Sequence, residues 1–406
     1  MIIDMDSHMY EQRDMWSRYM VNKDRENAMA IVDDELGYPM LRYKGRSPRG
    51  TYCWMGKPGF DENLLNLDAF MGQPQRDQRD GIPAKMRYED LPLSYTDAGA
   101  RVVEMDRQGV GESFVFPQWG LETEGTFFRD DLEGFRLNLE SWNRYCADMV
   151  IDSGGRLHPV AHLSLQGDQS WVVDQIRAVA RAGMKLAFFS ADLINGKRLS
   201  HPENAPIWQA FIENDVTATF HINIGSKFIP FAWIDNDHET FSAIGMSWLN
   251  MPPMLALSDL TLNGTLEDFP DLRVCVVELR APTWLGDWMA GMDRVYRSQP
   301  KMAGWNVRTL KNLPSDYIKR QVRFGALVED PVANAITTCG NLFGFGGDWP
   351  HPEGVDNPLK DFAEIVQFGE DSEAATAFWG GNAAWALGRT QAHPSQPAAA
   401  RPMERV

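Results

Sequence analysis

The chain has 406 residues, 44% of them hydrophobic, which is enough for one large core or two ordinary ones. Its formal net charge is -17 and it has no run of Lys or Arg, which argues against nucleic acid and anionic membranes as partners. No stretch reaches the apolar length that spans a bilayer, and no basic and apolar leader precedes the first residues, so we expect a soluble, cytoplasmic protein.

Residues Met1 to His8 begin with an apolar run and continue with alternating acids. This pattern predicts a short buried strand that places Asp6 and His8 on the same face at its carboxyl end. A carboxylate and an imidazole so placed can begin a metal site. The alternative is an N-terminal strand with an acid that caps a helix. We expect Glu11 and Asp14 to fix the chain as it leaves this strand.

Residues 9–92 show no clear period, and we interpret them as an insertion over the mouth of the main domain. From residue 95 the pattern is regular, and residues 96–108 predict a helix with Ala98, Val102, Val103 and Met105 on an apolar stripe. The further strands that we expect cover residues 112–117, 157–165, 184–189, 216–222, 272–278, 321–327 and 341–347. The further helices that we expect cover residues 131–150, 168–182, 203–214, 283–297, 357–367 and 371–387.

Eight strands that alternate with helices predict a parallel sheet closed as a (β/α)8 TIM barrel, here a single domain of residues 1–390 followed by a disordered Pro/Ala-rich tail at 391–406. Chemistry in such barrels sits where the strands end. The polar residues at the predicted strand ends are Asp6, His8, His221, Glu278 and Asp348.

Several longer motifs occur in a fixed order along the chain. They are Asp6-Ser-His8-Met-Tyr-Glu11, His162-Leu-Ser-Leu-Gln, Phe220-His221, the segment 263–272, Gly347-Asp-Trp-Pro-His-Pro-Glu-Gly354 and Gly381-Asn-Ala-Ala384. On these motifs the chain resembles the amidohydrolase-related family of metal-dependent barrel enzymes, which includes the aminocarboxymuconate semialdehyde decarboxylase-like proteins. The resemblance covers nearly the whole chain and implies that Asp6, His8, His221 and Asp348 are metal ligands.

The chain departs from the decarboxylase-like pattern at two positions. Asp6 replaces the first His of the usual His-x-His, and Glu278 stands where a His normally acts as acid and base. The second replacement puts a simple decarboxylase or hydrolase mechanism in doubt.

The predicted site therefore combines three carboxylates with two imidazoles and no thiolate, a donor set that suits iron or manganese and is large enough for two ions. Clustered carboxylates would also repel one another without a cation. Within the family, the chain resembles the TIM-barrel nonheme diiron monooxygenases that act in platensimycin and platencin biosynthesis. That resemblance implies two Fe ions, O2, an electron donor, and hydroxylation of an unactivated C–H bond in a hydrophobic, diterpenoid-type substrate that can be CoA-linked. Glu278 and Asp348 would be the catalytic residues.

Two other functions remain open. One is a redox-neutral decarboxylase or hydrolase of the amidohydrolase family with a single Zn or Mn ion, and the other is a metal-free scaffold. No GxGxxG, GxxxxGK[ST] or GxSxG motif is present to support a nucleotide cofactor or a serine nucleophile. We expect a homodimer by analogy with the family.

The remaining candidate residues have alternative interpretations. His238 is a candidate ligand of a second metal or a residue of a solvated loop, and His351 and Trp349 are candidates for substrate binding. Lys185 is either a carboxylated, metal-bridging lysine or the partner of a neighbouring acid. Glu278 has the alternative of a buried acid bonded to Arg280. Four further histidines are expected to be structural, His162 as a buried hydrogen-bonded residue and His158, His201 and His393 as surface residues.

The four cysteines lie far apart without a CxxC pair, and we expect reduced packing residues: Cys53, Cys146, Cys275 and Cys339.

Overall fold

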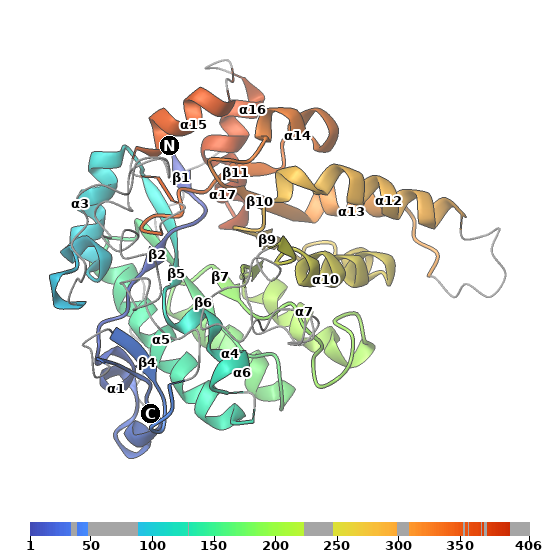
Figure 1. The fold of residues 1–406 in the computed structure, drawn as a ribbon. Helices are drawn as coiled ribbons and strands as arrows, with labels where there is room; N and C mark the ends of the chain where they lie inside the picture. Colours follow the sequence, from blue (N-terminus) through green and yellow to red (C-terminus); the bar gives the residue numbers. More distant parts are fainter. Residues whose placement is uncertain are drawn as a thin grey trace.

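The computed structural model describes residues 1–33, 39–47, 88–128, 130–222, 247–298, 308–351, 354–355, 357–366, 368 and 372–389. They form a parallel β-barrel surrounded by helices (Figure 1). The barrel strands are β1 (Ile3–Asp4), β5 (Glu112–Pro117), β6 (Leu157–His162), β7 (Leu186–Phe188), β8 (Thr217–Phe220), β9 (Val274–Val276), β10 (Val322–Ala326) and β11 (Phe343–Phe345). They pair in this order, and β2 (His8–Met9) continues β1 alongside β5. The predicted (β/α)8 TIM barrel is confirmed.

Three backbone hydrogen bonds join the first strand to the last and close the barrel. The Met5 amide donates to the Phe345 carbonyl, the His8 amide to the Trp349 carbonyl, and the Asp348 amide to the Asp6 carbonyl, each at 2.8 Å. Below we call this junction the seam. It places the two ends of the barrel sequence, and the polar residues that they carry, side by side.

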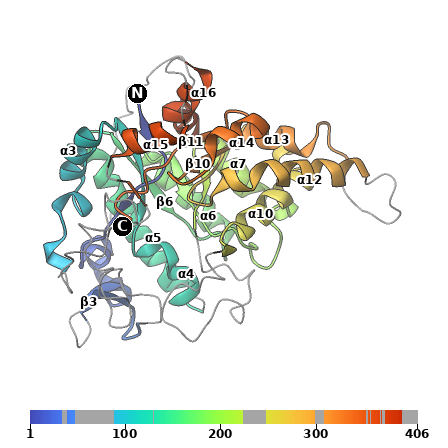
Figure 2. The same ribbon diagram turned by 45° about the horizontal axis from the view of Figure 1, so that its top comes forward.

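Helices cover the outside of the barrel in both ribbon views (Figures 1 and 2). They include α3 (Ala98–Gln108), α5 (Leu132–Asp152), α6 (Gln169–Arg181), α7 (Ala205–Glu213), α10 (Met251–Leu262), α12 (Leu285–Ser298), α13 (Pro314–Gln321), α14 (Val332–Cys339) and α15 (Pro358–Val366). The side chains of Asp97, Asp131 and Asp168 accept backbone N–H groups at the starts of α3, α5 and α6, as N-caps do. These caps explain why the predicted helix starts agree with the structure to within a few residues.

Two predictions of local structure differ from the observed fold. The helix expected at 371–387 forms over residues 373–386 but contains a π-helical turn, because α16 (Glu373–Thr376), the turn (Ala377–Gly381) and α17 (Asn382–Ala386) follow one another directly. Gly380 lies so close to the Met1 carbonyl that no Cβ would fit there. The insertion is also more regular than expected, since α1 (Met15–Tyr19) and a hairpin of β3 (Ala30–Asp33) and β4 (Pro39–Arg42) form within it. Residues 34–38 and 48–87 of the insertion and the tail at 391–406 lie outside the described residues.

Alternation along the strands separates two apolar layers. One buried cluster fills the barrel and includes Phe114, Phe116, Val160, Leu186, Phe188, Cys275 and Val277. The intervening residues, such as Val115, Ala161 and Ala187, belong to the cluster between the sheet and the helices. Cys146, Cys275 and Cys339 are buried free thiols, which confirms the packing prediction for them, and Cys53 lies outside the described residues. Within the described residues, none of the helices combines the length and the hydropathy that a membrane crossing requires.

Glu11 fastens the segment after β2 to the segment after β5. Its carboxylate is fully buried and accepts the amides of Trp119 at 2.9 Å and Gly120 at 2.8 Å. Burial raises the pKa of Glu11 from 4.5 to about 7, although the backbone hydrogen bonds oppose that rise. Glu11 therefore keeps its proton in the folded protein over a pH range in which the unfolded chain has lost it.

We expect this difference to make the unfolding free energy fall by roughly 3 kcal/mol as the pH rises from 4.5 to 7, at about 1.4 kcal/mol per unit of pKa difference. In Glu11→Gln, which does not titrate, that part of the pH dependence should disappear. Urea unfolding of both proteins at pH 4.5 and 7.5, with a chelator present, measures it. Equal slopes for the two proteins would contradict the assignment.

Candidate metal centre

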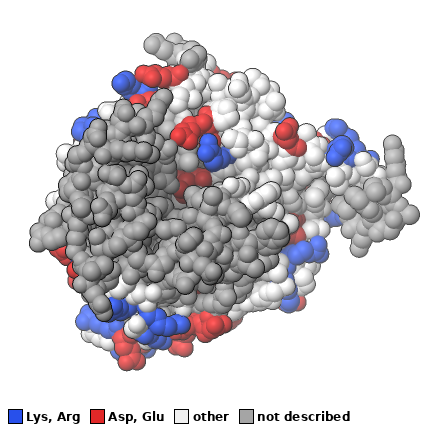
Figure 3. Space-filling view, in the orientation of Figure 1, with Lys and Arg blue, Asp and Glu red and all other residues white. Residues whose placement is uncertain are grey.

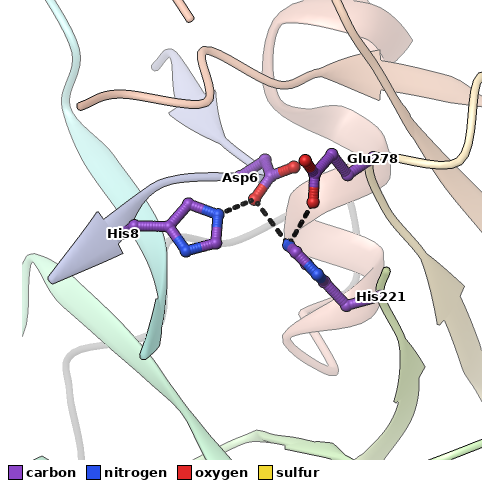
Figure 4. A group of neighbouring side chains, drawn as sticks. All are labelled: Asp6, His8, His221 and Glu278. Atoms are coloured by element: carbon purple, nitrogen blue, oxygen red, sulfur yellow. Dashed lines mark ion pairs between the residues drawn. The ribbon is translucent and has the colours of Figure 1, made fainter. Parts of the chain in front are cut away.

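Four buried side chains converge at the carboxyl ends of β1, β8 and β9 (Figure 4). The His221 Nε2 atom lies 3.0 Å from Glu278 Oε2 and 3.5 Å from Asp6 Oδ1. His8 Nε2 lies 3.6 Å from the same Asp6 oxygen. One donor atom from each of these residues falls within 4.8 Å of the others, which is the spacing of ligands around a metal ion.

A second group of potential ligands overlaps the first at His8. Asp348 Oδ1 lies 3.3 Å from His8 Nε2 and 3.0 Å from His351 Nδ1, and the rings of His8 and His351 stack at 3.7 Å. These three residues are also buried. The structure thus brings together the five residues predicted from the strand ends and adds His351 to the set.

Contacts on the far side of each ring orient the three imidazoles. His8 Nδ1 faces the Pro117 carbonyl at 3.2 Å, His221 Nδ1 faces the Ile222 carbonyl at 3.3 Å, and His351 Nε2 faces Gln118 Oε1 at 2.6 Å. Such contacts fix which nitrogen carries the proton. They leave His8 Nε2, His221 Nε2 and His351 Nδ1 directed toward the carboxylates.

Several of these donor atoms fit a cation because, apart from the ionisable groups of the same cluster, they face no partner. Both Asp6 oxygens, His8 Nε2, His221 Nε2 and His351 Nδ1 are buried without a hydrogen-bond partner. Burial raises the pKa of Glu278, while it lowers the pKa of His8. Burial also opposes protonation of His221, yet the carboxylates of Glu278 and Asp6 raise its pKa well above the usual value. A bound divalent ion would reduce the repulsion between the acids and would supply the contacts that the donor atoms lack.

The backbone is strained where two of these acids are presented. Glu278 and Asp348 have φ values of 59° and 50°, in the left-handed region that non-glycine residues seldom occupy. Strain of this kind costs about 1–3 kcal/mol per residue and clusters at functional sites. Beside Asp348, Gly347 allows close approach to β1, because a Cβ there would lie 2.5 Å from Asp4 Oδ2.

Asp4 was not predicted to be a functional residue, yet its side chain binds backbone amides on both sides of the seam. Its buried Oδ1 accepts the amides of Asp6 at 2.9 Å and Gly347 at 2.8 Å. Burial raises the pKa of Asp4 well above its usual value. The sequence did contain a signal for Asp4, because it follows two apolar residues in the predicted buried strand and a buried acid needs hydrogen-bond partners.

Arg101 was not predicted to be a functional residue either, because it lies outside the apolar stripe predicted for α3. In the structure Arg101 is buried, whereas Val103 of the predicted stripe is 69% exposed. Arg101 donates to the His8 carbonyl at 2.5 Å and the Ser94 carbonyl at 2.8 Å, and its guanidinium lies 4.1 Å from the centre of the Trp349 ring. It therefore holds both sides of the seam from the outside.

Two other predicted residues, Lys185 and Trp349, fall outside the donor set. Lys185 binds Asp215 at 2.6 Å, in agreement with the ion-pair alternative. Trp349 packs against Arg101 and Tyr95. Glu278, which belongs to the donor set, pairs with His221 and not with Arg280, because Arg280 lies near Asp330.

The remaining histidines have different surroundings. His162 is buried beside the Phe188 ring, and its Nε2 lacks the hydrogen bond that we expected. Burial lowers the pKa of His162 to about 3. His158 binds Glu112 at 2.6 Å, and His201 caps a short 3-10 helix (Pro202–Asn204). His238 and His393 lie outside the described residues.

The chain is similar to proteins of known family and known structure. The amidohydrolase family profile matches residues 3–389. An amidohydrolase from Mycobacterium avium subsp. paratuberculosis K-10 is similar at 21% identity and a TM-score of 0.72, with 95% of this chain and 98% of that chain covered. No curated protein matches the chain.

Two similar structures are of decarboxylases with bound manganese. The 5-carboxyvanillate decarboxylase from Novosphingobium aromaticivorans DSM 12444 has 16% identity and a TM-score of 0.62, with 96% of this chain and 97% of that chain covered. The dihydroxybenzoic acid decarboxylase from Polaromonas sp. JS666 has 13% identity and a TM-score of 0.54, with coverage of 95% and 96%. At these identities the likeness is evidence of the fold.

We expect His221→Ala and Asp6→Asn to weaken Mn2+ binding by more than about a hundredfold, because loss of an outer-shell contact alone costs 10–100-fold. Lys185→Met, which alters a polar residue of the same barrel outside the donor set, should bind Mn2+ as the parent does. Calorimetric titration of each purified variant with Mn2+ measures the difference. Full affinity in His221→Ala would remove His221 from the ligand set.

Arg101→Lys should weaken Mn2+ binding by about 10–100-fold, because an ammonium cannot reach both carbonyl groups and also cover Trp349. Arg107→Lys, an exposed change on the same helix, is the matched control. If the charge of Arg101 matters and its position does not, Arg101→Lys will bind normally, and Arg101→Gln will bind Mn2+ more tightly.

Proposed function

Because the chain belongs to the amidohydrolase family, we propose that it is a metal-dependent enzyme that carries out a redox-neutral decarboxylation or hydrolysis of a carboxylated substrate. The observation that carries the proposal is the buried convergence of Asp6, His8, His221, Glu278 and Asp348 at the carboxyl ends of the strands, where barrel enzymes act. The two manganese-containing decarboxylases of similar fold support this choice of reaction.

Asp6, His8, His221 and Asp348 would hold the ion. Their oxygen and nitrogen atoms suit Mn2+ or Zn2+, and when bound the ion would supply a Lewis acid that polarises a substrate oxygen. Glu278 is then the residue that moves a proton. In decarboxylation, the electron pair of the broken carbon–carbon bond stays on the substrate carbon, and that carbon takes its proton from the Glu278 carboxyl group.

His351 would orient Asp348, because its ring is fixed between Gln118 Oε1 and Asp348 Oδ1. Trp349 stays a candidate for substrate contact through the loop that it shares with Asp348. The closed packing of the donors leaves them shielded from bulk water, which strengthens their interaction with charge.

A second candidate is the O2-dependent diiron hydroxylase, and one specific observation favours it. The donor residues form two overlapping groups, Asp6-His8-His221-Glu278 and His8-Asp348-His351, which is more than a single ion requires. In that case Glu278 would be a metal ligand and not a proton carrier, and the enzyme would need an electron donor. The hydrophobic substrate wall predicted from residues 226–255 lies largely outside the described residues.

The metal content of protein expressed without added zinc separates the two candidates. We expect about one Mn or Zn per chain, no spectral change when O2 is added to the anaerobic protein, and CO2 release from one of a panel of carboxylated phenols. About two Fe per chain with an O2-dependent spectrum would instead establish the hydroxylase. In that case Glu278→Ala should lose one iron before the other.

A further inference from the structure

Arg280 is an exposed cation beside the buried carboxylate of Asp330. It lies two residues beyond Glu278, at the carboxyl end of β9, and its side chain is 53% exposed. Within the described part of the segments that follow β8, β9, β10 and β11, no other Lys or Arg occurs before the next helix. Among the described residues of these four segments, Arg280 is thus the only Lys or Arg.

The guanidinium of Arg280 retains most of its capacity to donate hydrogen bonds. Its Nε lies 3.5 Å from Asp330 Oδ1 and its Nη2 lies 3.8 Å from Glu329 Oε2. Both distances are longer than an ordinary N–H···O hydrogen bond. In contrast, Arg101 and Arg273 make contacts of 2.5 Å to their oxygen partners.

Asp330 fixes the direction of this side chain. Its carboxylate is fully buried, and Oδ2 accepts the Leu327 amide at 3.0 Å, so Oδ1 is left facing Arg280 Nε. Asp330 lies on the Nε side and Glu329 lies 3.8 Å from Nη2, beyond hydrogen-bond distance. The Nη groups can therefore still donate to an incoming carboxylate, which guanidinium binds through two parallel hydrogen bonds.

The backbone around Arg280 is strained as it is at the metal centre. Arg280 has a φ of 49°, and Glu278 one of 59°, so the turn after β9 contains two left-handed residues separated by Leu279. Hydrogen bonds from Thr283 Oγ1 to the Arg280 carbonyl and from Trp284 Nε1 to the Leu279 carbonyl, both at 2.7 Å, hold this turn. The turn thus presents Glu278 and Arg280 from one rigid segment.

We propose that Arg280, held by Asp330, is a binding site for a carboxylate of the substrate at the mouth of the barrel. The inference rests on the proposed function, because it takes the substrate to be a carboxylate. Its physical basis is charge, since a chain of net charge -17 with buried Asp6, Glu278 and Asp348 repels an anion unless a cation receives it. Figure 3 shows basic atoms directly beside acidic ones near the middle of the face drawn there.

Binding of benzoate and of its neutral analogue benzamide to the Mn2+-loaded protein tests the proposal. We expect benzoate to bind more tightly, and Arg280→Gln to weaken benzoate binding by about 10–100-fold without changing benzamide binding, Mn2+ content or Tm. Asp330→Asn should give a smaller loss of the same kind. Arg297→Gln, an exposed change on α12, is the control for the loss of one positive charge.

Failure of this inference differs from failure of the proposed function. If the protein binds Mn2+ and Arg280→Gln keeps the preference for benzoate, or if the parent shows none, the Arg280 site is wrong. The Arg280 site is also wrong if Arg280→Gln lowers the Tm and leaves benzoate binding unchanged. If the protein binds neither Mn2+ nor Zn2+, the proposed function fails, and the loss of benzoate preference in metal-free Arg280→Gln would still support the anion site.

Discussion

The arrangement of the candidate centre depends on the closure of the barrel between its first and last strands. The three backbone hydrogen bonds of the seam set Asp6 and His8 against Asp348, although more than 300 residues separate them in the chain. Asp4 binds amides on both sides of that junction, and Arg101 binds the His8 carbonyl while it covers Trp349. A parallel barrel has no free edge once it is closed, so the short segments that carry the donors start from the strand ends of one continuous sheet.

The energetic consequence is that the protein concentrates buried charge at the place where its backbone is most constrained. Several buried acids face one another, and two of them, Glu278 and Asp348, lie on left-handed residues. Such an arrangement is unfavourable for folding unless contacts elsewhere compensate for it. The apolar interior supplies that compensation, with Phe116 lying 4.4 Å from the His221 ring and Phe188 behind it. The fold stabilises the site, and a cation would complete it.

The sequence was informative where the signal is local. Periodic apolar residues predicted the strands and helices, and the barrel rule then identified five donors at the strand ends. Burial of Arg101 and the π-helical turn within the helix expected at 371–387 could not be predicted, because both depend on partners far away in the chain: the His8 carbonyl and the Met1 carbonyl. The missing hydrogen bond of His162 has the same origin, since only the packed barrel places Phe188 against that ring.

The position of His8 in both donor groups limits how the centre can be filled. Its Nδ1 faces the Pro117 carbonyl, so a single lone pair on Nε2 remains for metal binding. One nitrogen lone pair serves one ion, whereas a carboxylate has several and can join two. If a first ion takes that lone pair, a second ion beside His351 would have Asp348 and His351 left as donors from its group, close to the first ion. Occupancy of the two positions would then be thermodynamically linked, with each ion changing the affinity of the other by the same factor.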